Sequence, residues 1–228
     1  KIFNHIVVST DSIKIQKIAI KYGADSWFLR PKNLSKKTSS KESAIRHALL
    51  EAEKKYKEKY DVCIDLDITS PLRKVSDIKN AFKNFKNKNS SVLFSVTKSR
   101  KNPYFNMVEE TNNIVNLVKK PNKIIHSRQN APSVFDMNAS IYIWKRYKIL
   151  KSDNLYGAKT SIYEMPLDRS IDIDEELDFK IVIGKINELV AGAWITLGAF
   201  GLSLSIGISF SLILLFFRYS SIKPFIFL

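Results

Sequence analysis

The stretch VCIDLDITSPLRKVSDIKNAFKNF, residues 62–85, decides the fold. Residues 62–66 are mostly apolar and predict a short buried strand. A polar loop containing Pro71 follows, and the pattern then becomes helical from Val75 to Phe85. Residues 91–96 predict a second buried strand. Strand, helix and strand in this order are typical of an α/β fold with parallel neighbouring strands.

The same alternation continues on both sides of this stretch. Upstream, we expect strands at 6–9 and 25–29, a helix that Asp11 or Ser12 caps and Gly23 ends, and a helix over 40–56. Downstream, we expect strands at 104–108, 114–118, 138–144 and 160–164, and a last helix from about Asp174. The sequence therefore predicts a mostly parallel sheet with helices on both faces, interrupted by a small β subdomain at about 98–140.

The composition divides the chain into two parts. The 228 residues are 45% hydrophobic, which suffices for a packed core, but the last acidic residue is Glu188 and no charge occurs over 189–217. Crossing a bilayer takes about 20 apolar residues. We therefore predict a domain at 1–188 and a membrane-type tail at 189–228. The apolar helix of this tail would be transmembrane and would contact the membrane through 189–217. The alternative is a buried core helix.

The net charge of +15 raises the question of nucleic-acid binding. The basic residues are mostly lysines spread along the predicted helices, which is typical of solvated outer faces, and stacking aromatics do not interleave with them. We therefore expect no nucleic-acid partner. Cys63 is the only cysteine, which excludes an internal disulfide and a zinc site built from cysteines. We expect a cytoplasmic protein, with membrane anchoring at its C-terminus as the additional hypothesis.

Two segments combine side chains suited to phosphate chemistry. Ser70 and Arg73 follow the strand at 62–66, where ligands bind in open α/β sheets, although Ser70 could simply cap the next helix. Asp172 and Asp174 lie two apart in an extended segment, so their carboxylates share a face. Mg²⁺ suits such a pair because it takes one or two carboxylates together with substrate phosphates. The alternative is that Asp174 only caps the last helix.

A third segment is less specific. Arg128 lies in a predicted loop and could hold a substrate carboxylate in a bidentate fork. Asn138 and Tyr142 lie on the strand that follows and could line a sugar pocket. Taken alone, they are equally consistent with a loop arginine and a core strand.

Six motifs in order resemble the acylneuraminate cytidylyltransferases, also called CMP-sialic acid synthetases. They are Val-Ser-Thr-Asp (8–11), Phe-Leu-Arg-Pro (28–31), Thr-Ser-Pro-Leu-Arg (69–73), Arg-Gln-x-x-Pro (128–132), Asn-Ala-Ser-Ile-Tyr (138–142) and Ser-Ile-Asp-Ile-Asp (170–174). The resemblance covers Lys1 to about Ile183. It implies a Rossmann-like nucleotidyltransferase fold, a homodimer formed through the inserted subdomain, and Mg²⁺-dependent synthesis of a CMP-sugar and pyrophosphate from CTP and a nonulosonic acid.

The resemblance also assigns roles to individual residues. Arg30 and the turn 38–41, which contains Ser40, are similar to the residues that contact cytidine. Ser70, Arg73 and Tyr156 are similar to residues that line the pocket. Contacts to the sugar acid fall on Arg128 and Tyr142, and in dimers of this family the partner subunit provides some of the site contacts. Asp172 and Asp174 are similar to the metal ligands. The sugar's anomeric hydroxyl would attack the α-phosphorus, a reaction that depends on positioning and charge neutralisation.

The sequence departs from this family in two places within the domain. Family members open with a strand and a glycine-containing basic loop that grips the CTP phosphates. Because nothing similar occurs here, we expect the chain to lack its first βα unit, on the order of 30 residues, and to bind CTP weakly. Asp67 replaces a glutamine common in sialic-acid members and, as a substrate-binding position, indicates a different nonulosonic acid of legionaminic or pseudaminic type.

Two other functions remain open from the sequence. One is a cytidylyltransferase for 3-deoxy-manno-octulosonate, although the usual Gln-Gly-Asp-Glu-Pro loop of those enzymes is absent. The other is a membrane-anchored, non-catalytic remnant or interaction module, which would explain both the missing phosphate loop and the apolar tail.

Overall fold

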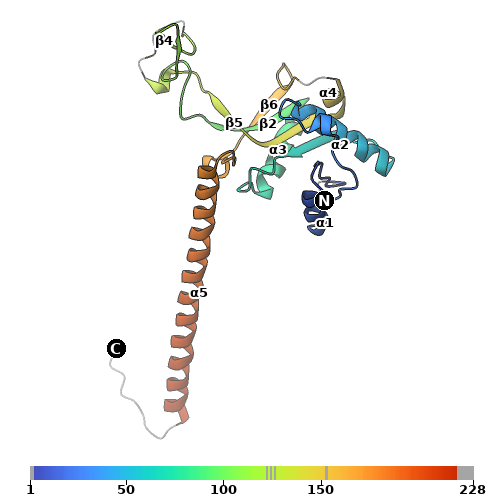
Figure 1. Cartoon of the computed structure of the whole chain (residues 1–228). Helices are drawn as coiled ribbons and strands as arrows, with labels where there is room; N and C mark the ends of the chain where they lie inside the picture. The colour runs from blue at the N-terminus through green and yellow to red at the C-terminus, as the bar shows by residue number, and fades with distance from the viewer. Residues whose placement is uncertain (1–2, 122, 124, 126, 152–153, 220–228) are drawn as a thin grey trace. The chain divides into compact units, whose positions relative to one another are not determined.

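The computed structural model describes residues 3–121, 123, 125, 127–151 and 154–219. The chain divides into two compact units, Lys1–Asp174 and Glu175–Leu228, which are described separately (Figure 1).

The first unit is built on a four-stranded sheet in the order β1-β5-β2-β6. Its strands are β1 (Val62–Leu66), β5 (Phe135–Lys145), β2 (Val92–Lys98) and β6 (Thr160–Glu164). Within this sheet, β2 and β6 pair in parallel, whereas β5 lies between β1 and β2 and runs antiparallel to both. The prediction of a mostly parallel sheet is therefore wrong. A buried strand has the same apolar pattern in either direction, so the sequence does not reveal its polarity.

Helices cover both faces of this sheet, as the sequence predicts. They are α2 (Lys41–Tyr56) and α4 (Arg146–Lys151) on one face and α3 (Val75–Asn87) on the other (Figure 1). Successive strand residues point to opposite faces. One core cluster contains Ile45, Leu49, Phe94, Tyr142, Trp144 and Ile149, and the other contains Ala81, Phe85, Leu93, Ile141, Ile143 and Met165.

The shorter elements differ more from the sequence predictions. Ser12 caps α1 (Ile13–Lys21) and Gly23 follows it with a φ of 85°, both as expected. In place of the strands expected at 6–9 and 25–29, the structure has one isolated parallel bridge, between Val7 and Asp25. Residues 103–106 form turns, and in the described part of this segment β3 (Val108–Thr111) and β4 (Ile114–Leu117) make the hairpin. The remaining elements are short 3₁₀ turns, η1 (Lys32–Leu34), η2 (Arg128–Asn130) and η3 (Leu167–Arg169).

A bulge interrupts the pairing of β5 with β2. Phe94 pairs with Tyr142, whereas Val96, two residues on, pairs with Met137. The extra residues of β5 include Ala139, whose φ of 50° lies in the left-handed region that L-residues seldom adopt. Bulges of this kind redirect side chains beside functional sites.

A buried ion pair ties the start of α3 to the segment after β6. Arg169 donates to both oxygens of Asp77, with Nε–Oδ2 and Nη2–Oδ1 distances of 3.0 and 2.9 Å. Asp77 also accepts from the Lys74 backbone N–H at 2.9 Å and is only 1% exposed. Burial alone would raise the pKa of Asp77, but the hydrogen bonds from Arg169 and the Lys74 N–H lower it below its usual range.

The second unit contains the helix α5 (Glu176–Tyr219). The prediction of a transmembrane helix is wrong: within the ranges that the structure describes, no helix is both long and apolar enough to span a membrane. That prediction relied on the length and the lack of charge of residues 189–217. The helix α5 also includes Glu176 and Asp178 in its first turn, and hydroxyl groups at Thr196 and Ser205 that bond to its own carbonyls. Residues 220–228, part of the predicted tail, lie outside the described residues.

Candidate functional site

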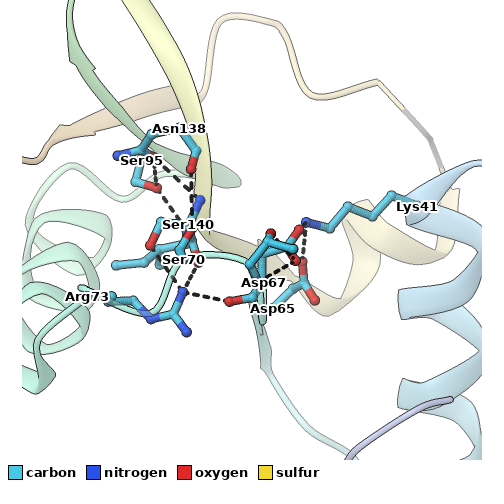
Figure 2. Close-up of polar contacts among 10 residues, drawn as sticks. Lys41, Asp65, Asp67, Ser70, Arg73, Ser95, Asn138 and Ser140 are labelled. Carbon is cyan, nitrogen blue, oxygen red and sulfur yellow. Dashed lines mark hydrogen bonds and ion pairs between the residues drawn. The ribbon is translucent and has the colours of Figure 1, made fainter. Parts of the chain in front are cut away.

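An ion cluster lies where β1 ends, next to the first turn of α2. Lys41 Nζ is 3.0 Å from Asp65 Oδ2 and 2.9 Å from Asp67 Oδ2 (Figure 2). The Thr69 hydroxyl donates to the other oxygen of Asp67 at 3.0 Å. The same ammonium group lies 4.3 Å from the ring centroid of Tyr142 on β5, a cation–π distance. Strand β1, helix α2 and strand β5 thus converge on one charged group.

The cluster fixes the charge states of Lys41 and Asp67. Burial on its own would lower the pKa of Lys41, but attraction by Asp65 and hydrogen bonds to both carboxylates raise it above its usual value. Burial would raise the pKa of Asp67, and the hydrogen bonds from Lys41 and Thr69 lower it below its usual value. Lys41 and Asp67 are therefore both charged at neutral pH.

Arg73 braces the loop after β1 against β5. Its Nη1 donates to the Ser140 carbonyl at 2.6 Å, the Ser140 hydroxyl at 3.1 Å and the Asp67 carbonyl at 3.1 Å (Figure 2). Burial lowers the pKa of Arg73, although Asp67 and Asp65 oppose this shift. The guanidinium group thus holds the Asp67 loop in place through backbone contacts.

Asn138 connects three segments from within the β5 bulge. Its side-chain oxygen accepts from the Ser95 hydroxyl at 2.6 Å, its amide donates to the Ser170 hydroxyl at 3.0 Å, and its carbonyl accepts from the Ser70 hydroxyl at 3.5 Å. The side chain is buried. Asn138 and Ser70, both predicted as substrate contacts, therefore bond to the protein itself and position the surrounding segments.

The carboxylate pair predicted to hold a metal lies beside the same loop. The Ile173 N–H donates to the Thr69 carbonyl at 2.9 Å, which anchors the extended segment carrying Asp172 and Asp174. Asp172 Oδ1 is buried and has no hydrogen-bond partner. A buried carboxylate oxygen without a donor is costly unless a cation meets it, so this residue fits a divalent metal.

A cation at this pair would need ligands from elsewhere. Among the residues that the structure describes, no group of three or more His, Cys, Asp or Glu side chains could hold a metal. Two carboxylates completed by substrate phosphates and water are the arrangement that Mg²⁺ favours.

The other predicted residues are distributed as follows. Ser40 caps α2 by accepting from the Ser43 N–H at 3.2 Å, which places Lys41 at the cluster. Arg30 donates to the hydroxyl and the carbonyl of Ser9. Tyr156 is exposed, and its ring packs edge-on against Phe94.

Arg128 belongs to the segment between β4 and β5. Its Nη2 donates to the Arg100 carbonyl at 2.7 Å, and η2, which carries it, borders an open hollow of about 530 Å³. The hollow is lined by lysines and by a tyrosine: Lys119, Lys120, Lys123 and Tyr104. This segment is strongly basic.

From the sequence, Lys41 is placed only at the end of the turn 38–41 that the family resemblance assigns to cytidine contacts, and Asp65 is given no role. Lys41 occurs among many lysines and Asp65 within an otherwise apolar strand, so neither belongs to a distinctive pattern. Asp65 is a charged residue inside a predicted buried strand, and such a residue usually has a partner of opposite charge. This was the signal that could have identified it.

Comparison with known proteins gives one family. A sequence model described as cytidylyltransferase matches residues 1–195. The post-translational flagellin modification protein B of Campylobacter coli is 43% identical over 188 residues, covering 82% of this chain and 79% of that protein. The CMP-N,N'-diacetyllegionaminic acid synthase of Campylobacter jejuni is 44% identical over 182 residues, covering 80% and 77%.

A solved structure shares the fold. CMP:2-keto-3-deoxy-manno-octonic acid synthetase complexed with CTP superimposes with a TM-score of 0.50 at 12% identity, covering 83% of this chain and 81% of that one.

Proposed function

The chain belongs to the cytidylyltransferase family, and from this premise we propose that it transfers CMP from CTP to the anomeric hydroxyl of a nonulosonic acid, releasing pyrophosphate. The hydrogen bond from the Ile173 N–H to the Thr69 carbonyl is the observation that carries this proposal. It brings the Asp172–Asp174 carboxylates beside the loop at the end of β1. Metal ligands and a loop for substrate recognition thus lie together at one edge of the sheet.

The residues of the site have distinct proposed roles. Asp172 and Asp174 would hold Mg²⁺, which when bound neutralises phosphate charge and favours departure of pyrophosphate. Arg73 and Asn138 hold the Asp67 loop, the β5 bulge and the Ser170 segment in fixed relative positions. Phosphoryl-type transfer depends mainly on such positioning and on electrostatic stabilisation, and it requires no nucleophilic side chain.

We propose a legionaminic-type acid as the sugar substrate. The support is the relative from Campylobacter jejuni that is 44% identical and is named for N,N'-diacetyllegionaminic acid. Asp67, at a position where sialic-acid enzymes commonly have glutamine, agrees with a sugar other than sialic acid. The likeness to the 3-deoxy-manno-octonate enzyme, at 12% identity, extends to the fold alone.

Pyrophosphate release with CTP, Mg²⁺ and different sugar acids tests this choice. We expect kcat/KM for N,N'-diacetyllegionaminic acid to exceed that for N-acetylneuraminic acid by on the order of a hundredfold, because an unmatched polar substituent leaves buried groups unpaired. The reaction with 3-deoxy-manno-octulosonate should be slower still. Fastest turnover of that eight-carbon acid, or none of any sugar acid, would contradict the proposal.

We also propose that two copies associate through the segment around the β3–β4 hairpin. Isolated two-stranded hairpins are marginally stable, and this one exposes apolar side chains to solvent. Val108, Ile114 and Val115 are 64%, 62% and 62% exposed. A second copy of the chain would cover them, and the family resemblance places the dimer contact in this segment.

Placing a charge on the hairpin should therefore separate the dimer. We expect Ile114→Glu to raise the dimer dissociation constant at least about thirtyfold, since a carboxylate would be buried at an apolar contact. Asn87, an exposed neutral residue at the end of α3 and outside the hairpin, provides the control variant Asn87→Glu. Sedimentation velocity measures both. A wild-type chain that is monomeric at micromolar concentration, or an Ile114→Glu variant that dimerises normally, would refute this interface.

A further inference from the structure

The ion cluster at the end of β1 affects how the site receives charged substrates, and the inference drawn from it rests on the proposed function. Both proposed substrates are anions: CTP carries a triphosphate and the sugar carries a carboxylate. Asp65 and Asp67 nevertheless lie at the ligand-binding end of the strand. Two unpaired carboxylates would repel both substrates.

Lys41 is the cation that the structure places between these carboxylates. It is 3.0 Å from Asp65 and 2.9 Å from Asp67, and it leaves the three-residue cluster with one net negative charge instead of two. Its side chain is 38% exposed, so the ammonium group is not sealed within the core and its charge acts on the surroundings of the β1 end. The ring of Tyr142, 4.3 Å away, holds the ammonium group from the β5 side.

We propose that Lys41 is a specificity-determining positioning residue, which offsets Asp65 and Asp67 so that the site accepts an anionic sugar acid. Its role is electrostatic and does not require direct contact with the reacting atoms. The role should be visible as a preference for the acid over an uncharged derivative of the same sugar.

The test uses the full chain and two probes, N,N'-diacetyllegionaminic acid and its methyl ester, with binding measured calorimetrically in the presence of Mg²⁺ and α,β-methylene-CTP, an analogue that cannot release pyrophosphate. We expect Lys41→Met to weaken binding of the acid about tenfold at low salt and less at high salt, while the ester changes less than about twofold. Lys41→Arg, which keeps the charge, should bind both probes nearly as the wild type does. Lys54→Met on the exposed surface of the same helix is the control for the change in net charge.

A double variant separates charge from structure. Lys41→Met together with Asp65→Asn restores the original net charge and removes the carboxylate that would otherwise be buried without a cation. We expect this variant to fold and to recover acid binding to within about threefold of the wild type. If Lys41→Met alone does not fold, the double variant and Lys41→Arg still decide the question.

The outcomes distinguish the two proposals. A wild-type chain that binds and turns over no nonulosonic acid refutes the proposed function, and the role of Lys41 with it. A wild-type chain that is active, with variants that lose acid and ester equally or with a double variant that does not recover, refutes the role of Lys41 alone.

Discussion

Asp172→Asn should abolish pyrophosphate release, lowering kcat at least about a thousandfold. Asp172 Oδ1 is buried and has no donor within the protein, so the substitution removes a ligand for a cation and breaks no hydrogen bond of that oxygen. Loss of activity should therefore occur without loss of the fold. Steady-state release of pyrophosphate from CTP and a nonulosonic acid measures the effect.

A second measurement does not depend on turnover. Mg²⁺ stabilises a protein that binds it in the folded state, so the melting temperature of the wild type should rise with added Mg²⁺ and that of Asp172→Asn should rise less. Asp168→Asn, at an exposed aspartate of the preceding 3₁₀ turn, is the matched control and should behave as the wild type does. Equal Mg²⁺ dependence in Asp172→Asn and the wild type would remove Asp172 from the metal site.

Asp77→Ala should lower the free energy of unfolding by about 3 kcal/mol, because it leaves Arg169 and the Lys74 N–H without their buried acceptor. Urea denaturation at neutral pH measures this difference. Asp61→Ala, at an exposed aspartate just before β1, is the control, with an expected change within about 0.5 kcal/mol. A similar loss in both variants would show that the ion pair does not stabilise the fold.

The effect of Asp77 should also depend on pH. Its pKa is lowered in the folded state, so the ion pair stabilises the protein fully above the unfolded value of about 3.9. This contribution is lost as the pH falls through the folded pKa. The difference between the wild type and Asp77→Ala should thus be constant from pH 7 to about pH 5 and shrink in stronger acid. A difference that grows on acidification would contradict this assignment.

The sequence predicted the elements more reliably than their arrangement. The bounds of β1 and β6 agree with the apolar runs, and Ser40 caps α2, because local composition determines these features. The direction of β5 depends on how the chain returns after the β3–β4 hairpin, which no local pattern records. The strand expected at 104–108 was wrong for a similar reason: apolar residues there lie in turns held by hydrogen bonds to Asn102.

The site was predicted in part. Family motifs predict Asp67, Arg73 and Asp172 as site residues, and the structure brings their segments together, while their roles stay predictions. They placed Lys41 in a turn expected to contact cytidine but did not predict its ion pairs, because these form between elements that meet only in the folded chain. Whether Arg30, Arg128 and Tyr156 contact substrate stays a prediction.

The position of β5 has a consequence for how the protein is made. Strands β1 and β2 are close in sequence but are not neighbours, because β5 fills the space between them. While the ribosome is translating the segment before residue 135, both strands have an open edge facing the missing partner. Strands β1 and β2 can join one sheet only after β5, which ends at Lys145, has emerged from the ribosome. Until then, the unpaired edges of these two apolar strands are exposed to pairing with other molecules.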